Sequence, residues 1–230
     1  MSRWAVVMAL ALGGCAPATA PGRAADVALT WERRLERRPE APPPVPVVVF
    51  MHGCTGIWTS DTPAWVSFLA SHGYAVVAPD SFARPGRLSN CDPRTLTTGR
   101  VPDVQRLRYE EIAYALARVR ELPWADRDRV FLMGHSEGGV AASLWDRPGF
   151  RGVIVSGRPC RARSPHLSGL WTPRGVPVLS IGWAMDPWYR GPGSCQGTRA
   201  QVVTLQGIGH ATSSSPEAQR AVLAFLDALR

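Results

Sequence analysis

The stretch from Val130 to Ala142 most constrains the fold of this chain. Four apolar residues run directly into Gly134-His-Ser136-Glu-Gly138, and small residues follow. This order predicts a buried strand, a tight turn and the start of a helix. Such a turn exposes a serine hydroxyl at the end of a strand, beside the N–H groups of the next helix. A glycine-rich turn without chemistry can carry the same five residues, so the rest of the chain must supply a base and an acid.

Apolar runs around this stretch predict an α/β fold. Continuous apolar runs indicate strands buried on both faces, and segments with helical spacing separate them. Alternating strands and helices build a mainly parallel, doubly wound sheet with helices on both faces, because the crossovers are right-handed. The expected strands are 47–51, 74–80, 129–133, 153–155, 176–181 and 201–205, and the expected helices are 65–72, 104–122, one after Ser136 and one from Pro216.

The length of the chain favours one domain. Its 230 residues, less a leader, suffice for one sizeable core and are too few for two. We therefore expect a single domain over residues 26–230, without a large lid domain. An irregular edge strand is expected within 27–38, and residues 81–102 form a long loop that carries Cys91.

The first residues have the pattern of an export signal. One arginine precedes about nine apolar residues, a run too short for a permanent membrane helix. Leu12-Gly-Gly-Cys15 then resembles the motif at which a bacterial lipoprotein is cleaved and lipidated. We predict a lipoprotein-type signal peptide over residues 1–14 and lipidation of Cys15.

A flexible tether follows, over residues 15–25, and is rich in Ala, Pro, Thr and Gly. Acyl chains on Cys15 would anchor the exported protein to a membrane, facing the periplasm. Ala16, where an aspartate would retain a lipoprotein at the inner membrane, indicates the outer membrane. Ordinary cleavage after Ala20 is the alternative, although Pro21 disfavours it.

The charge of the chain is strongly basic. The formal net charge is +8, and all 26 basic residues are arginine. This balance fits an anionic partner, either a nucleic acid or a membrane surface. The arginines are scattered, however, without the aromatic pattern of RNA-binding proteins, and codon bias in a GC-rich genome explains them equally well. We predict no nucleic-acid partner.

The cysteines indicate disulfides. Apart from Cys15, the chain has four: Cys54, Cys91, Cys160 and Cys195. An even number in an exported chain suggests two disulfides, and three pairings are possible. There is no Cys-x-x-Cys pair, and we predict no metal site.

The serine needs a base to become a nucleophile. In parallel sheets, catalytic groups gather at the carboxyl ends of the strands. His210 follows the last predicted strand in a glycine-containing loop, so we predict that His210 is the base. The other histidines are His52, His72, His135 and His166.

The acid that orients the histidine is expected between Ser136 and His210 in sequence. Asp186 directly follows a predicted strand and is the candidate best placed to stabilise a charged His210. The other acids in this interval are Glu137, within the turn, and Asp146, at the end of a helix. Asp80, at an earlier strand end, remains a lesser alternative.

Backbone N–H groups are expected to stabilise the oxyanion of an attacked carbonyl. The N–H of Glu137 follows the serine, and that of Cys54 or Thr55 lies in the turn after an earlier strand. The side chain of His52 is expected to fix this turn rather than to perform chemistry. Three tryptophans in loops near these motifs are candidates for an apolar pocket wall: Trp58, Trp183 and Trp188.

Together these motifs resemble the dienelactone hydrolase family of the α/β-hydrolases. The matching stretches are Val47–Gly56, Gly73–Ser81, Asp128–Gly139, Pro177–Asp186 and Gly207–His210. The resemblance implies the α/β-hydrolase fold and hydrolysis of small esters or lactones without a metal or organic cofactor. It also implies the disulfides Cys54–Cys91 and Cys160–Cys195, as in exported members. The original dienelactone hydrolases use a cysteine nucleophile, whereas Ser136 stands here and favours a general serine esterase.

The sequence therefore predicts a carboxylic-ester hydrolase with Ser136, Asp186 and His210 as its catalytic residues. Two alternatives remain open. One is a serine peptidase of the same fold, and the other is a surface lipoprotein that binds without catalysis.

Overall fold

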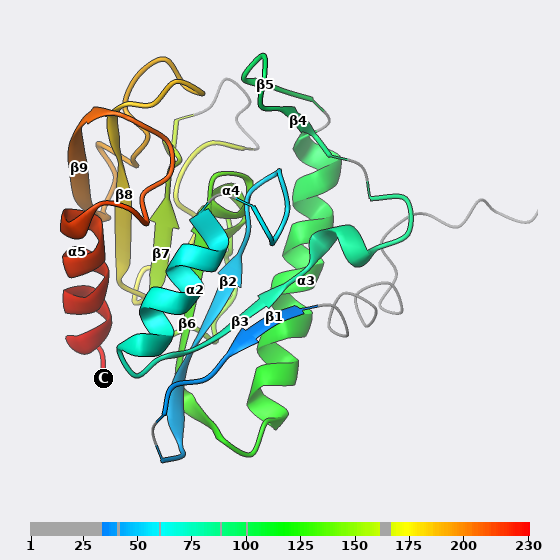
Figure 1. Ribbon diagram of the computed structural model, residues 1–230, viewed down its shortest axis with the longest axis vertical. Helices are drawn as coiled ribbons and strands as arrows, with labels where there is room; N and C mark the ends of the chain where they lie inside the picture. The colour runs from blue at the N-terminus through cyan, green and yellow to red at the C-terminus, as the bar shows by residue number, and fades with distance from the viewer. Residues whose placement is uncertain (1–33, 41, 60, 88, 100, 162–166) are drawn as a thin grey trace, which may run out of the picture.

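A seven-stranded sheet forms the centre of the computed structural model (Figure 1). The structure describes residues 34–40, 42–59, 61–87, 89–99, 101–161 and 167–230, so the predicted signal peptide, Cys15, the tether and His166 lie outside the described residues. The strands of the sheet are β1 (Arg34–Arg37), β2 (Val45–Met51), β3 (Ala75–Pro79), β6 (Ala125–His135), β7 (Val153–Ser156), β8 (Val178–Met185) and β9 (Gln201–Ile208).

The strand order is β1-β3-β2-β6-β7-β8-β9. All neighbouring pairs in this sheet are parallel except β1 and β3, which are antiparallel at the edge. The parallel strands carry the continuous apolar runs that identified them in the sequence, because helices cover both faces. The predicted doubly wound α/β sheet is confirmed.

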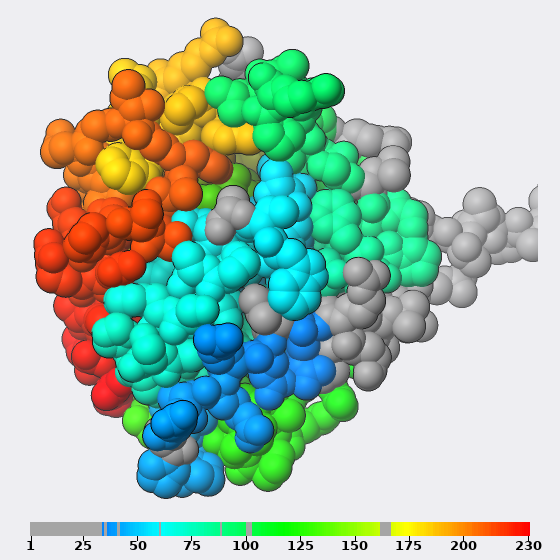
Figure 2. All heavy atoms as spheres, in the orientation of Figure 1, coloured from blue at the N-terminus to red at the C-terminus, as the bar shows by residue number. Residues whose placement is uncertain are grey.

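Within the residues that the structure describes, two helices pack on each face of the sheet. The helices are α2 (Asp61–Ser71), α3 (Val101–Glu121), α4 (Glu137–Ser143) and α5 (Pro216–Asp227). Alternate residues of β6 point to opposite faces: Leu132 packs in the cluster with α3 and α4, and Phe131 in the cluster with α2 and α5. The space-filling view shows α2 in cyan and α5 in red on the same side of the molecule (Figure 2).

Several boundaries differ from the sequence prediction. Helix α3 begins at Val101 rather than at residue 104, because the proline at 102 falls in the first turn, where no intrahelical N–H bond is needed. Asp103 therefore lies in the first turn and is not the cap. Helix α2 begins at Asp61, and α5 has the predicted cap, in which Ser215 Oγ accepts the N–H of Ala218.

The long loop before α3 contains short elements: the 3-10 helix η1 (Ser81–Ala83) and a hairpin of β4 (Cys91–Asp92) and β5 (Thr97–Thr98). No lid of domain size is inserted into the described part of the chain. Among the same residues, no helix has the length and apolar character needed to cross a membrane.

Candidate active site

Ser136 occupies a strained turn between β6 and α4. Its φ of 55° and ψ of −114° are unusual for a residue with a side chain. A Cβ on Gly134 would lie 2.1 Å from the carbonyl oxygen of Gly138, and one on Gly138 would lie 2.0 Å from that of Met51. Only glycine fits at either position, so the two glycines let strand and helix approach closely enough to present the serine at the strand end.

His210 and Asp186 form a hydrogen-bonded pair at the ends of neighbouring strands. His210 Nδ1 lies 2.7 Å from Asp186 Oδ2, and the Asp186 side chain is fully buried. Asp186 follows β8 and His210 follows β9, as predicted. Because Nδ1 faces the carboxylate, Nε2 is the nitrogen of His210 available for proton transfer.

The loop that carries His210 is fixed by Asp61, the first residue of α2. The buried carboxylate of Asp61 accepts the backbone N–H groups of Thr212 (3.1 Å) and Ser213 (2.8 Å), and the indole N–H of Trp65 (3.1 Å). Burial alone would raise the pKa of Asp61, but His135 and the hydrogen bonds from Ser213 and Thr212 lower it below its usual value. Asp61 is therefore an ionised acceptor that holds the histidine loop.

His135, between Gly134 and the serine, packs behind His210. The two imidazole rings lie 4.8 Å apart, and His135 Nδ1 lies 3.1 Å from Asp61 Oδ2. Burial lowers the pKa of His135 to about 4, so the ring is neutral near pH 7. At the end of β7, Gly157 has a φ of +58°, and a Cβ there would lie 2.7 Å from the His135 ring and 3.1 Å from the His210 carbonyl oxygen.

The two backbone N–H groups expected to bind the oxyanion belong to residues that line a cavity together with the serine. Cys54, Ser136 and Glu137 line one cavity, and an ideal Cβ on Gly53 would lie only 3.5 Å from the Ser136 Cβ. Within the described residues, neither the Cys54 N–H nor the Glu137 N–H donates a hydrogen bond to the protein. The role of these two N–H groups in binding an oxyanion stays a prediction.

The side chain of Glu137 does not enter the cavity as a free carboxylate. Glu137 Oε1 lies 2.6 Å from Arg87 Nη2 and 3.7 Å from Arg108 Nε, and all three side chains are buried. Arg87 also donates to Ser81 Oγ, and Ser81 Oγ donates to Glu111. This network joins the turn at Ser136, α3 and the long loop. Each buried charge in it is neutralised by an opposite charge beside it.

His52 has the positioning role expected of it. Its Nδ1 lies 2.6 Å from the Gly53 carbonyl oxygen, and its Nε2 accepts the N–H of Ser81. Burial and the adjacent Arg108 hold the pKa of His52 well below its ordinary value, so the ring is neutral. Arg108 also donates to the His52 carbonyl oxygen at 2.6 Å, which fixes the turn that presents the Cys54 N–H.

The cavity beside Ser136 has a volume of about 1190 Å³. Trp188 lines it, as proposed from sequence, but Trp58 and Trp183 do not. Trp58 is 66% exposed, and Trp183 lies within β8 rather than in a loop, where its indole N–H donates to the Ala211 carbonyl. The wall of the cavity is partly polar, since Arg158 and several loop segments contribute to it.

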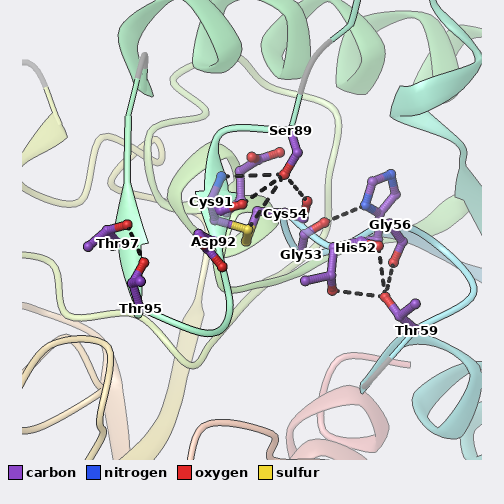
Figure 3. Close-up of a disulfide and its surroundings, with 12 residues drawn as sticks. His52, Gly53, Cys54, Gly56, Thr59, Ser89, Cys91, Asp92, Thr95 and Thr97 are labelled. Carbon is purple, nitrogen blue, oxygen red and sulfur yellow. Dashed lines mark hydrogen bonds between the residues drawn. A yellow bond between two sulfur atoms is a disulfide. The ribbon is translucent and has the colours of Figure 1, made fainter.

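Two disulfides brace this end of the sheet. Cys54 is bonded to Cys91, which attaches the long loop to the turn beside Ser136 (Figure 3). In the same close-up, Ser89 Oγ donates to the Cys54 carbonyl oxygen at 3.3 Å. Cys160, after β7, is bonded to Cys195, before β9. Of the three possible pairings, the structure has the one that the family resemblance implied.

Sequence reasoning missed three contributors to the site. Asp61 lay before the helix expected at 65–72, Arg87 was one of many loop arginines, and Tyr189 was not considered. The position of Tyr189, three residues after the predicted acid, was the one local signal that pointed to the site. Within the described ranges, no group of three or more His, Cys, Asp or Glu side chains is arranged to hold a metal ion.

Comparison with solved structures finds the same fold in several hydrolases. An acetyl xylan esterase of Paenibacillus sp. R4 is 17% identical, with a TM-score of 0.60 over 85% of this chain and 78% of that one. A protein of Klebsiella pneumoniae, named provisionally as a dienelactone hydrolase, is 16% identical, with a TM-score of 0.58 over 85% and 91%. The propionate-bound esterase Est2 of Thermogutta terrifontis is 15% identical, with a TM-score of 0.55 over 85% and 89%.

These likenesses show a shared fold. No curated protein is matched by the sequence of this chain. The profile of the alpha/beta hydrolase family, by contrast, matches residues 48–229, from within β2 nearly to the end of the sequence. This protein therefore belongs to the alpha/beta hydrolase family.

Proposed function

We propose that this protein is a serine hydrolase that cleaves carboxylic esters or lactones of small molecules through an acyl-enzyme. Ser136 is the nucleophile, His210 the base, and Asp186 the acid that orients His210. The backbone N–H groups of Cys54 and Glu137 bind the oxyanion. Membership of the family supports hydrolase activity, and the esterases of the same fold support an ester substrate.

The reaction follows from proton transfer between Ser136 and His210, with the Asp186 carboxylate beside the histidine. Nε2 of His210 takes the Ser136 proton as Oγ attacks the ester carbonyl, and the buried Asp186 carboxylate stabilises the imidazolium. The carbonyl electrons move to oxygen, which the two N–H groups stabilise. The alcohol then leaves with the proton from His210. Water attacks the acyl-enzyme in the same way and releases the acid.

One observation carries this proposal: the histidine whose Nδ1 is 2.7 Å from a buried carboxylate has its ring 4.8 Å from that of His135, the residue next to the serine on the strained strand-to-helix turn. The test is labelling of the purified protein with a fluorophosphonate probe, read by mass spectrometry, together with hydrolysis of short p-nitrophenyl esters. We expect one label, on Ser136, and Ser136→Ala should lose both labelling and turnover. Turnover that survives in Ser136→Ala would contradict the assignment.

The same experiments separate the alternatives. A serine peptidase would cleave members of a peptide panel, whereas an esterase would turn over esters and leave the panel intact. A binding protein without catalysis would neither take the probe nor turn over any ester.

We also propose that the protein is an exported lipoprotein anchored through Cys15 at the outer membrane. The lipoprotein-type motif supports this, and so do two disulfides, which persist in oxidising compartments. Expression of the full chain in a Gram-negative host with labelled palmitate should place label and protein in the outer-membrane fraction. Cys15→Ser should lose both. An unlipidated product that begins at Pro21 would contradict lipidation.

A further inference from the structure

Tyr189 lies in a tight loop directly after the acid of the catalytic pair. The loop is closed by the N–H of Asp186, which donates to the Gly191 carbonyl at 2.7 Å, and the N–H of Tyr189 donates to the Asp186 carbonyl at 3.1 Å. Asp186 Oδ1 accepts the N–H of Trp188 at 3.0 Å. The backbone that fixes the acid thus also fixes the position of Tyr189.

The phenol of Tyr189 reaches the nucleophile. Its hydroxyl lies close enough to the Ser136 side chain for the serine to lower the pKa of the phenol, and its ring lies 6.2 Å from the His210 ring. Tyr189 also lines the cavity beside the serine. The side chain is 39% exposed, yet loss of water around its hydroxyl raises the pKa of Tyr189 to about 12, so the hydroxyl keeps its proton at neutral pH and can donate a hydrogen bond to a reacting oxygen.

The direction of approach determines which oxygen Tyr189 can serve. The N–H groups of Cys54 and Glu137 come from the ends of β2 and β6 and take the carbonyl oxygen. Tyr189 comes from the loop after β8 and packs beside His210, which must deliver a proton to the departing alcohol. A donor on this side of Ser136 faces the position of the leaving group.

We propose that the Tyr189 hydroxyl donates a hydrogen bond to the alcohol oxygen of the ester while the acyl–oxygen bond breaks. In that step the bonding electron pair moves to the alcohol oxygen, the Nε2 proton of His210 transfers to it, and Tyr189 retains its own proton. In deacylation, water occupies the same position and meets the same hydroxyl. This inference rests on the proposed esterase function and makes Tyr189 a catalytic residue.

The leaving group provides a test that a purely structural role would not pass. A good leaving group such as p-nitrophenolate needs little stabilisation, whereas an alkoxide needs it most. We would compare Tyr189→Phe with the wild type on p-nitrophenyl, phenyl and ethyl acetate, which share one acyl group. We expect kcat/KM to fall by less than about twofold for the first ester and about tenfold for the last, the effect of one lost hydrogen bond.

Trp188→Phe is the matched control. Trp188 belongs to the same loop, and its ring lies 5.6 Å from the His210 ring. Its substitution should change kcat/KM by one common factor for all three esters. The change alters the packing around His210 but removes no hydroxyl group from the neighbourhood of Ser136. Thermal unfolding of both variants checks that each is folded.

The outcomes separate this inference from the proposed function. An active wild type in which Tyr189→Phe loses the same factor on every ester, or loses nothing, would overturn the role of Tyr189 alone. A wild type that turns over none of the esters would overturn the esterase assignment and this role with it. A loss that grows as the leaving group becomes poorer would support the role.

Discussion

The Asp61 carboxylate accepts the backbone N–H of Ser213 at 2.8 Å and so ties the start of α2 to the loop that carries His210. His210, the proposed base, is held from two directions, since Asp186 contacts its ring and Asp61 contacts the chain just after it. Asp61 touches no reacting atom, so it acts through the position of His210.

Asp61→Asn should therefore impair catalysis beyond its cost in stability. The variant replaces an ionised acceptor with a neutral amide, which weakens the bonds to Thr212 and Ser213. A small displacement of a catalytic group costs as much as about 100-fold in rate, so we expect a large fall in kcat with little change in KM. Asp146→Asn, at an exposed carboxylate away from the cavity, is the control and should retain the wild-type kcat. Wild-type kcat in folded Asp61→Asn would contradict the positioning role.

The Cys54–Cys91 disulfide should matter to turnover as well as to stability. Loss of a cross-link spanning 37 residues costs about 4 kcal/mol of unfolding free energy in the chain-entropy estimate. Because Cys54 is also the proposed donor of an oxyanion N–H, the double variant Cys54→Ser/Cys91→Ser should lower kcat under conditions in which it remains folded. Urea unfolding and ester kinetics on the same samples separate the two effects. Cys160→Ser/Cys195→Ser is the comparison, and an equal fall in kcat there would remove the special role of Cys54.

The buried ion pair of Glu137 and Arg87 should be costly to break. Glu137→Gln leaves the Arg87 guanidinium buried without its carboxylate, which typically costs about 3–5 kcal/mol. Glu121→Gln removes the exposed partner of Arg118 and should cost less than about 1 kcal/mol. Urea denaturation of both variants measures the difference. A similar small loss in each would mean that the buried pair contributes no more than a surface pair.

Acid should destabilise the fold through His135. Its folded pKa of about 4 lies below the unfolded value of 6.5, so between these limits the unfolded chain binds more protons than the folded one. Stability then falls as the pH drops from 6.5 to 4, by roughly 3 kcal/mol from this residue. Asn at position 135 cannot titrate, so the wild type should lose more unfolding free energy over this window than His135→Asn. Parallel pH profiles of the two proteins would contradict this assignment.

The parts of the site that could be predicted are those that depend on residues close together in the sequence. Gly134, Ser136 and Gly138 specify their turn locally, because the glycines are required by strand–helix contact. Asp186 and His210 could be found because each follows a recognisable buried strand, and parallel strands end at the same edge. The same logic gave the sheet, the absence of a large lid in the described part and the cap of α5.

The remaining features depend on contacts between distant segments. Asp61 lies 151 residues before its partner Thr212, and it stands outside the helix that the sequence predicted at 65–72. Arg87 was one arginine among many until the fold brought it to Glu137, 50 residues away. The disulfide pairing likewise follows from which loops the sheet brings together. The predicted start of α3 was wrong because aspartate is a common N-cap residue, so Asp103 was taken as the cap. In the structure the helix has already begun at Val101.

Gly157 sets a limit on how this site can change under selection or in a laboratory library. The position lies at the end of β7, between the strands that carry the nucleophile and the acid, and any side chain there would meet both His135 and the histidine loop. Residues on the open side of the cavity, such as Leu96 and Gln196, are free to vary as new substrates are sampled. Substitutions are therefore tolerated at the rim of the cavity. Position 157 accepts only glycine, although this residue neither takes part in the reaction nor binds the substrate.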